Sequence, residues 1–331
     1  MNSILAKVTH SSKIPIIILL FLIIAFFSWQ SPNFLTTANF LNVFRQISMI
    51  GIAGIGMICV MLTGGIDLSI SSQVTFVNIM CAYMMVKNGI PPVYACFITL
   101  VIATLVGMLN GILVAYGKLM PLISTLCMQN ILKGVSFIIS KGIPIFGFPV
   151  AFKKLGQGYV GIFPIPVIIM ALICVIGAVF LMRSFPGRYF YAVGGNEEAS
   201  RLSGINTKQV KVLAYTVCGF FSGVAGIIWL SRVNSGQPTT GNGFEFDVIS
   251  GLVLGGVSIM GGSGDVLGAV LGIIVIGLLN NGLILINMGE FYQLLIKGLV
   301  LLLAIGIDSF KRNFKGTLML KFIKSPKGAQ S

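Results

Sequence analysis

Hydrophobic residues occur in long runs along the whole chain, separated by shorter polar segments. Crossing the hydrocarbon core of a membrane takes roughly 20 helical residues, and several runs approach that length. The pattern predicts an all-α, polytopic membrane protein with about ten transmembrane helices in a single integral domain, residues 1–331. The predicted spans lie near residues 14–29, 47–62, 74–86, 92–116, 119–140, 166–182, 212–230, 247–260, 266–286 and 291–308.

Two of the predicted spans, 74–86 and 247–260, are short for a membrane. They are flanked by the glycine-containing stretches "TGGIDLSISS" and "MGGSGD", so we expect them to be tilted, broken or partly re-entrant. The stretch "FLTTANFLNVFRQ", Phe34 to Gln46, is too polar to span and is expected to form a short interfacial helix.

Sequence echoes suggest two weakly related halves, as many transporters have, although the spacing between echoes differs. "MLTGGIDLSISS" in the first half resembles "IMGGSGDV" in the second, and "GMLNGIL" resembles "GLLNNGLIL". Glycines three to five residues apart predict helix packing faces. These are Gly219, Gly223 and Gly226 in one run and Gly268, Gly272 and Gly277 in another.

Composition supports the membrane assignment and excludes several functions. Hydrophobic residues make up 56% of the chain and charged residues only 9%. The net charge of +14 comes from loops between apolar runs, which argues against a nucleic-acid partner. His10 is the only histidine, so multi-histidine metal sites and histidine triads are excluded, and the six cysteines are interpreted as apolar fillers. We therefore expect no metal and no cofactor.

The distribution of lysine and arginine predicts the orientation. The N-terminal run resembles a signal peptide but lacks a small-residue cleavage site, so we expect a retained first span. Placing the N-terminus in the cytoplasm puts most of the 22 basic residues on the cytoplasmic side. Both termini are then cytoplasmic, with a C-terminal tail at 309–331 and the longest internal loop at 183–211.

That internal loop contains "GRYFYAVGGNEEASRLSGI", a polar segment between two apolar runs. Asn196 is suited to cap a helix whose first turn carries Glu197 and Glu198, and Gly204 is suited to end it in the left-handed conformation. A helix of about two turns is too short to be stable alone in water. With aromatic surface beside it at residues 189–191, it fits docking in a cleft of another protein. The alternative is a solvated connector.

Three blocks in order resemble the permease subunits of ribose-type sugar ABC importers. They are "TGGIDLS", the internal loop above, and "SGQPTTGNGFEFDVISGLVLGGVSIMGGSGDVLGAVLG". The resemblance implies about ten helices, a second permease subunit around a central pathway, a periplasmic sugar-binding protein outside, and a multi-pass location in a bacterial inner membrane. It also implies that a cytoplasmic ATP-binding subunit docks on the loop, at Gly194, Gly195, Asn196, Glu197, Glu198, Arg201, Ser203 and Gly204.

One further observation fits this resemblance, and departures from the family pattern limit what it says of the substrate. No G-x-x-x-x-G-K-[ST] phosphate loop occurs, so energy must come from a partner. Ile70 and Ser71 after "GGIDLS", and Phe246 in "GFEFD", depart from the usual family pattern and weaken any transfer of substrate identity.

Polar residues within the spans are candidates for a substrate pathway. Amides can match sugar hydroxyls without the desolvation cost of full charges, but hydrogen bonding between helices is an equal alternative. Asp67 and Asp265 also fit helix caps or turns, and Lys133 and Lys297 fit either snorkelling or the outer mouth of a cavity. The pathway candidates are Asp67, Asn110, Gln129, Asn130, Lys133, Asn280, Asn281 and Lys297.

The sequence thus predicts a permease subunit that moves a monosaccharide or similar polyol-like ligand in contact with membrane lipid, and that is not itself an enzyme. An ion-coupled secondary sugar transporter is the main alternative, but deep acids or histidines are lacking. A lipid-modifying membrane enzyme is disfavoured because no His, Asp and Glu cluster lies at either interface.

Overall fold

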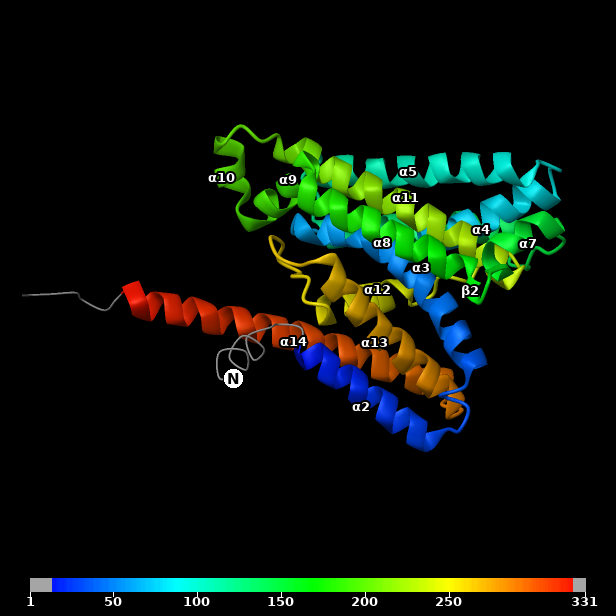
Figure 1. The fold of residues 1–331 in the computed structure, drawn as a ribbon. Helices are drawn as coiled ribbons and strands as arrows, with labels where there is room; N and C mark the ends of the chain where they lie inside the picture. Colours follow the sequence, from blue (N-terminus) through cyan, green and yellow to red (C-terminus); the bar gives the residue numbers. More distant parts are fainter. Residues whose placement is uncertain (1–13, 324–331) are drawn as a thin grey trace, which may run out of the picture.

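The computed structural model describes residues 14–323, with side chains as far as residue 306. Within this range the chain is almost entirely helical, and its one small sheet is an antiparallel pair of two-residue strands (Figure 1). The elements are α2 (Ile14–Gln30), α3 (Thr37–Leu62), α4 (Ile70–Val86), α5 (Pro92–Ala115), α6 (Pro121–Ser140), α7 (Val150–Gln157), β1 (Tyr159–Val160), β2 (Phe163–Pro164), α8 (Ile165–Arg183), α9 (Phe185–Gly195), α10 (Glu197–Leu202), α11 (Thr207–Val233), α12 (Phe244–Leu254), α13 (Val266–Leu285) and α14 (Glu290–Ile323).

A helix occupies each of the ten predicted spans, which confirms an all-α membrane protein. Six helices in the described range are long and apolar enough to cross a membrane: α3, α5, α6, α8, α11 and α13. Helices α2 and α4 are apolar but have only 17 residues each, and α12 has 11. The count of about ten crossings is therefore not confirmed by length and hydropathy.

Two predicted boundaries were wrong. Phe34 to Gln46 does not form a separate interfacial helix, because α3 runs without a break from Thr37 to Leu62. Its polar residues find partners: the Arg45 guanidinium donates to the Gln157 carbonyl at 3.0 Å and lies 4.5 Å from the ring centre of Tyr159. The eighth span ends early, at Leu254, and the chain continues to Asp265 as a turn whose glycines Gly256, Gly261, Gly262 and Gly264 have positive φ.

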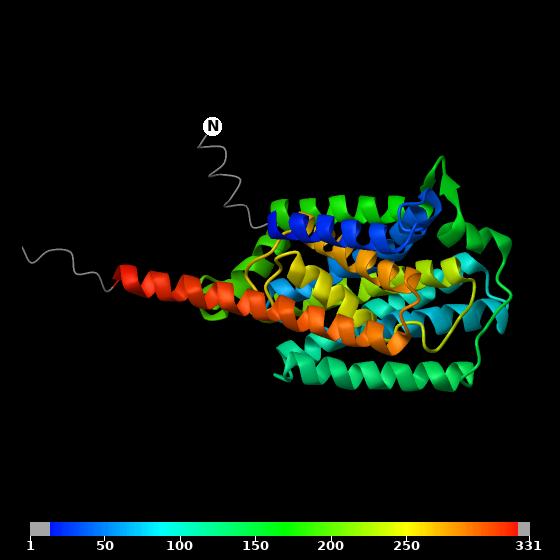
Figure 2. The ribbon, with the colours of Figure 1, turned by 90° about the horizontal axis from the view of Figure 1, so that it is seen from below.

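Helices α3 and α11 form the centre of the molecule, and α5, α4 and α8 pack around them. Residues from Ile47 to Leu62 of α3 are all buried. In contrast, most of α6 is exposed; it contacts the rest mainly through α4 and forms an outer edge of the bundle (Figure 2). An exposed helix that carries Gln129, Asn130 and Lys133 is therefore available to a lumen, a partner or lipid.

The small residues of α11 and α13 pack as predicted. A methyl group added at Gly219 would lie 2.8 Å from the Cα atom of Gly107, so the backbones of α11 and α5 are in direct contact. Gly226 meets α4 in the same way, at the carbonyl oxygen of Val74, and Gly272 of α13 meets α12 at Gly255. Small residues let helices approach this closely, which maximises van der Waals contact where lipid offers no hydrophobic driving force.

Candidate functional site

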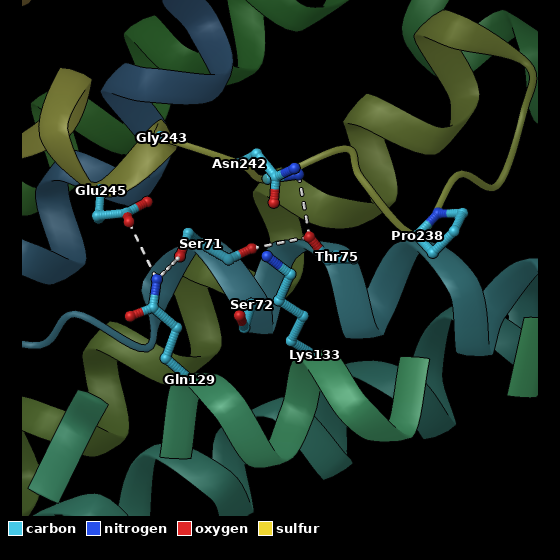
Figure 3. Close-up of a pocket in the computed structure, with 10 residues that line it drawn as sticks. Ser71, Ser72, Thr75, Gln129, Lys133, Pro238, Asn242, Gly243 and Glu245 are labelled. Carbon is cyan, nitrogen blue, oxygen red and sulfur yellow. Dashed lines mark hydrogen bonds between the residues drawn. The ribbon is translucent and has the colours of Figure 1, made fainter. Parts of the chain in front are cut away.

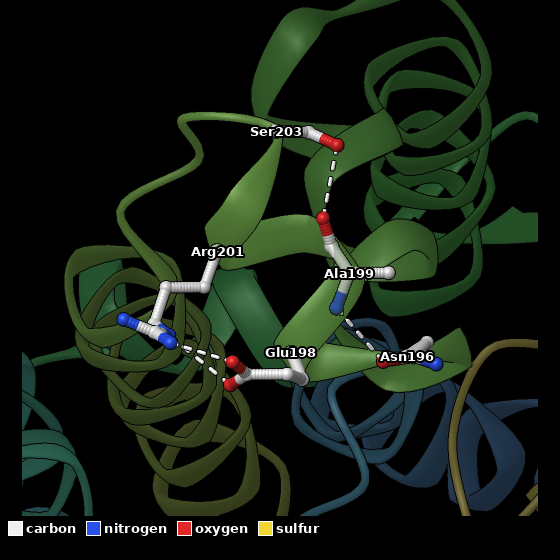
Figure 4. A network of polar contacts seen from close by, with 5 residues as sticks. All are labelled: Asn196, Glu198, Ala199, Arg201 and Ser203. Atoms are coloured by element: carbon white, nitrogen blue, oxygen red, sulfur yellow. Dashed lines mark hydrogen bonds and ion pairs between the residues drawn. The ribbon is translucent and has the colours of Figure 1, made fainter.

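The loop between α8 and α11 contains two helices, α9 and α10, joined at Asn196. The side-chain oxygen of Asn196 accepts a hydrogen bond from the backbone nitrogen of Ala199 at 2.9 Å, which confirms the predicted cap (Figure 4). Gly204, with φ of +85°, follows the end of α10 as expected. The Ser203 hydroxyl donates to the Ala199 carbonyl at 2.9 Å and closes the last turn.

The charged residues of α10 pair with neighbours within the chain. Arg201 and Glu198 form an ion pair of 2.5 Å across one turn, and Glu197 pairs with Lys211 of α11 at 2.7 Å (Figure 4 shows the first pair). Hydrogen bonding and charge from Arg201 lower the pKa of the Glu198 carboxyl below its usual value. This pair therefore holds at neutral pH and is lost only as the pH falls through that lowered pKa.

Most of α10 faces away from the bundle. Ser200 is its only buried residue, and Leu202, which the sequence reasoning did not single out, is 76% exposed. The expected aromatic surface beside α10 was partly wrong, because Phe190 is fully buried against Phe180 of α8. The hydroxyl of Tyr191 donates to the Gly264 carbonyl at 2.9 Å, so this tyrosine ties α9 to the 256–264 turn.

Three glycine pairs meet at the base of α10, and we call this contact the glycine junction: Gly64–Gly65, Gly194–Gly195 and Gly261–Gly262. The backbone nitrogen of Gly262 donates to the Leu62 carbonyl, the end of α3, at 3.0 Å. A methyl group at Gly194 would collide with that same carbonyl oxygen, and one at Gly261 would lie 2.7 Å from the nitrogen of Gly64. At these glycines the end of α9 therefore touches two distant turns through backbone atoms, in addition to the side-chain hydrogen bond of Tyr191.

A polar pocket of about 220 Å³ lies between α4, α6 and the segment that leads into α12 (Figure 3). Two predicted pathway residues, Gln129 and Lys133, line it from α6. The other polar residues that line it include Ser71, Ser72, Thr75, Asn242 and Glu245.

Hydrogen bonds connect the walls of this pocket. The Gln129 amide nitrogen donates to the Ser71 hydroxyl and to Glu245 Oε1, both at 3.0 Å, and so links α6 to α4 and α12. The Thr75 hydroxyl accepts from the backbone nitrogen of Gly241 at 3.0 Å. Glu245 was missed by the sequence reasoning; its only signal was an acidic residue after "GNGF", at the start of a short apolar helix.

The other predicted pathway residues lie elsewhere. Asn110 is fully buried and donates to the Ser69 hydroxyl at 2.8 Å, next to Asp67, whose Oδ1 accepts from the Ser69 backbone nitrogen at 2.9 Å. Asp67 thus closes the turn between α3 and α4. Asn281 of α13 exchanges hydrogen bonds of 2.8 and 2.9 Å with Asn39 of α3.

Four further predicted residues differ in their surroundings. Asn280 is buried, and within residues 14–323 neither side-chain polar atom has a hydrogen-bond partner. Asn130 is exposed and bonds only its own helix, at the Leu126 carbonyl. Lys297 of α14 pairs with Asp247 of α12 at 2.9 Å. Asp265 caps α13 through the backbone nitrogen of Gly268 at 2.8 Å, as its helix-cap alternative expects.

Comparison with known proteins points to a single class. Residues 39–305 match the family described as the permease component of the branched-chain amino acid transport system. The chain is 41% identical to the ribose import permease protein RbsC of Bacillus subtilis (strain 168), with 88% of this chain and 91% of the relative covered. The corresponding values for the Escherichia coli (strain K12) protein of that name are 38%, 89% and 93%.

A more distant relative is named for a different sugar, xylose. The xylose transport system permease protein XylH of Escherichia coli (strain K12) is 30% identical, with 87% of this chain and 89% of the relative covered. No solved structure matches the chain.

Proposed function

Because the chain belongs to the family of ribose-type permease subunits of ABC importers, we propose that it moves ribose or a similar monosaccharide inward. Family membership makes it a multi-pass transport component of the inner membrane, not an enzyme, and implies a separate ATPase and a periplasmic binding protein. We further propose that a second permease subunit, identical or related, completes a central pathway.

The proposed topology has ten crossings, made by α2, α3, α4, α5, α6, α8, α11, α12, α13 and α14, with both termini in the cytoplasm. The excess of basic residues on the side that contains the 183–211 loop supports this orientation. Helix α12, with 11 residues, reaches only about 16 Å at 1.5 Å per residue, so in this arrangement it is a half-helix completed by the 256–264 turn.

The observation that supports docking of the ATPase most strongly is the exposure of α10. A six-residue helix is too short to persist alone, yet it is capped, closed by hydrogen bonds, and presents Leu202 and the Glu198–Arg201 pair outward. An exposed apolar side chain rimmed by charges is suited to anchor in a pocket of a partner. We propose that residues 194–204 dock in the ATPase.

Exchange of the two charges tests this proposal. Glu198→Arg combined with Arg201→Glu keeps an ion pair within α10 but reverses the charges offered to a partner, so the subunit should fold while the ATPase dissociates during purification. The alanine pair, Glu198→Ala with Arg201→Ala, should act in the same direction. In both variants sugar uptake into proteoliposomes should fall in proportion to the ATPase that is lost.

A matched control is available at the far end of the molecule. Lys153→Ala with Lys154→Ala changes two charges on α7, which lies at the opposite end from α10 (Figure 1), and should leave ATPase retention unchanged. Full assembly and normal uptake in the charge-exchanged variant would reject docking at α10.

For the sugar pathway we propose the polar pocket beside α6 and the polar residues of α6 next to it. Gln129 and Lys133 line that pocket, and Asn130 is exposed on the same helix. The contacts of Asn110, Asn281 and Lys297 favour bonds between helices for those residues. Asn280, buried without a partner in the described range, remains a pathway candidate.

A further inference from the structure

Glu245 is a buried acidic residue of the polar pocket with spare hydrogen-bonding capacity. It is 6% exposed, and its Oε1 atom accepts from Gln129. Its Oε2 atom is buried and has no hydrogen-bond partner among the residues that the structure describes. A buried polar atom without a partner is costly, and such exceptions often mark a place where a water, an ion or a ligand binds.

The groups opposite Glu245 restrict what that ligand is. Lys133 extends from α6 toward α4 inside the same pocket, and hydroxyls of Ser72 and Thr75 lie beside it (Figure 3). A metal cation would meet the Lys133 ammonium, and an anion would meet the Glu245 carboxyl. A neutral ligand that accepts a hydrogen bond from Lys133 and donates one to Glu245 suits both groups.

A hydroxyl group has this dual capacity, because it carries one donor and two acceptor positions. A molecule with several adjacent hydroxyls could donate to Glu245 while it accepts from Lys133 and the pocket hydroxyls. Amides and hydroxyls around Glu245 and Lys133 resemble the few convergent polar groups that fix orientation in small-molecule sites.

We propose that Glu245 accepts a hydrogen bond from one hydroxyl of the transported sugar during passage, so that sugars with this hydroxyl are transported faster than sugars without it. Gln129 is the residue that positions Glu245. This inference rests on the proposed function, since it names a contact for the same substrate. Gln129 holds the carboxyl by one oxygen and thereby directs the other toward the pocket.

The test compares ribose with its 2-, 3- and 5-deoxy analogues, in proteoliposomes that contain the complete importer. The binding protein is supplied saturated with each sugar, so that the maximal uptake rate reports the permease. The wild type should transport at least one deoxy analogue on the order of tenfold more slowly, as expected for loss of a hydrogen bond to a buried carboxyl. In Glu245→Gln that penalty should shrink several-fold, and uptake of ribose itself should fall.

Two further variants complete the experiment. Gln129→Met removes the amide that holds Glu245 at similar size, and should reduce the same penalty in part. Glu290→Gln, an exposed acid at the start of α14, should behave as wild type. ATPase retention and melting temperature are measured on every variant, and Gln129→Met still gives a result if Glu245→Gln does not fold.

The outcomes distinguish a failure of the Glu245 inference from a failure of the proposed transport function. The inference would be overturned if the wild type takes up ribose but Glu245→Gln and Gln129→Met still transport the deoxy analogues as slowly, relative to ribose, as the wild type does. That result would leave the proposed function in place. A wild-type importer that moves no ribose and no related sugar would instead reject the proposed function. Uptake that requires a particular metal cation and loses this requirement in Glu245→Gln would also contradict the inference, because the pocket would then be a cation site.

Discussion

Asn110 and Glu245 are both buried polar residues of the membrane domain, but they differ in their partners and in their position relative to the polar pocket. The Asn110 amide nitrogen bonds Ser69 and thereby joins α5 to the turn that precedes α4. Glu245 is joined to α6 by one oxygen and has the other free of partners in the described chain. The Asn110 side-chain oxygen also lacks a partner in the described chain, but Asn110 is not among the residues that line the polar pocket, whereas Glu245 is. Only the free acceptor of Glu245 is therefore available to a ligand in that pocket.

Replacement of Asn110 by leucine should therefore lower stability more than transport. Asn110→Leu removes one of the two donors to the Ser69 hydroxyl, the other being the Gln73 side-chain amide at 2.8 Å. Loss of one hydrogen bond costs about 1 kcal/mol, so the melting temperature of the purified subunit should fall by a few degrees. Uptake per folded complex should stay near wild type.

Asn130→Leu is the matched control for melting temperature, since Asn130 is exposed and bonds only its own helix. Its melting temperature should change little. A loss of uptake per folded complex in Asn110→Leu, at an unchanged melting temperature, would return Asn110 to the sugar pathway.

At the scale of single elements, hydropathy located the helices well but not all of their ends. Helix α3 continues through a polar stretch because Asn39 bonds Asn281 of α13 and Arg45 bonds the last residue of α7, contacts that no local pattern reveals. Cap chemistry was more informative: Asn196 and Gly204 placed both ends of α10 correctly, because capping depends on residues within a few positions.

Removal of the Asn196 cap should destabilise α10 and weaken docking of the ATPase. Asn196→Ala removes the acceptor for the Ala199 amide, which should destabilise this short helix by about 1 kcal/mol. Hydrogen exchange of the α10 amides should become several-fold faster, and ATPase retention should weaken in proportion. Asn196→Ser, which keeps a capping oxygen, should resemble wild type, and unchanged exchange in the alanine variant would contradict the stabilising role of the cap.

At the scale of the whole molecule, class and membrane location could be predicted from the sequence, but most of the pocket could not. Gln129 and Glu245 are 116 positions apart, and only the packing of α4, α6 and α12 brings them together. Glu245 lies in the first turn of an otherwise mostly apolar helix, and composition does not reveal that it is buried. The two predicted halves stay a prediction, although Gly64–Gly65 and Gly261–Gly262, one pair from each, meet at the glycine junction.

Gly194 is the position at which this junction is most sensitive to a side chain. Gly194→Ala adds a methyl group that collides with the Leu62 carbonyl oxygen, so α9 must shift away from the end of α3. The exposed face of α10 is unchanged, and the ATPase should remain bound. Sugar moved per ATP hydrolysed should fall several-fold.

Gly195→Ala is its control, because a methyl group added there would meet nothing within 4 Å in the described structure. It should couple normally. Normal sugar transport per ATP in Gly194→Ala would show that the close contact is not needed for coupling.

Contact through backbone atoms has a mechanical consequence. Side chains between two moving elements absorb small displacements by changing rotamer. Backbone atoms in van der Waals contact have no such freedom, so a displacement of one element moves the other. A push on α10 of less than an ångström would therefore reach the end of α3 and the 256–264 turn with little slack. Because that turn follows α12 and leads into α13, the same push would act on the C-terminal end of α12, the short helix whose first turn carries Glu245.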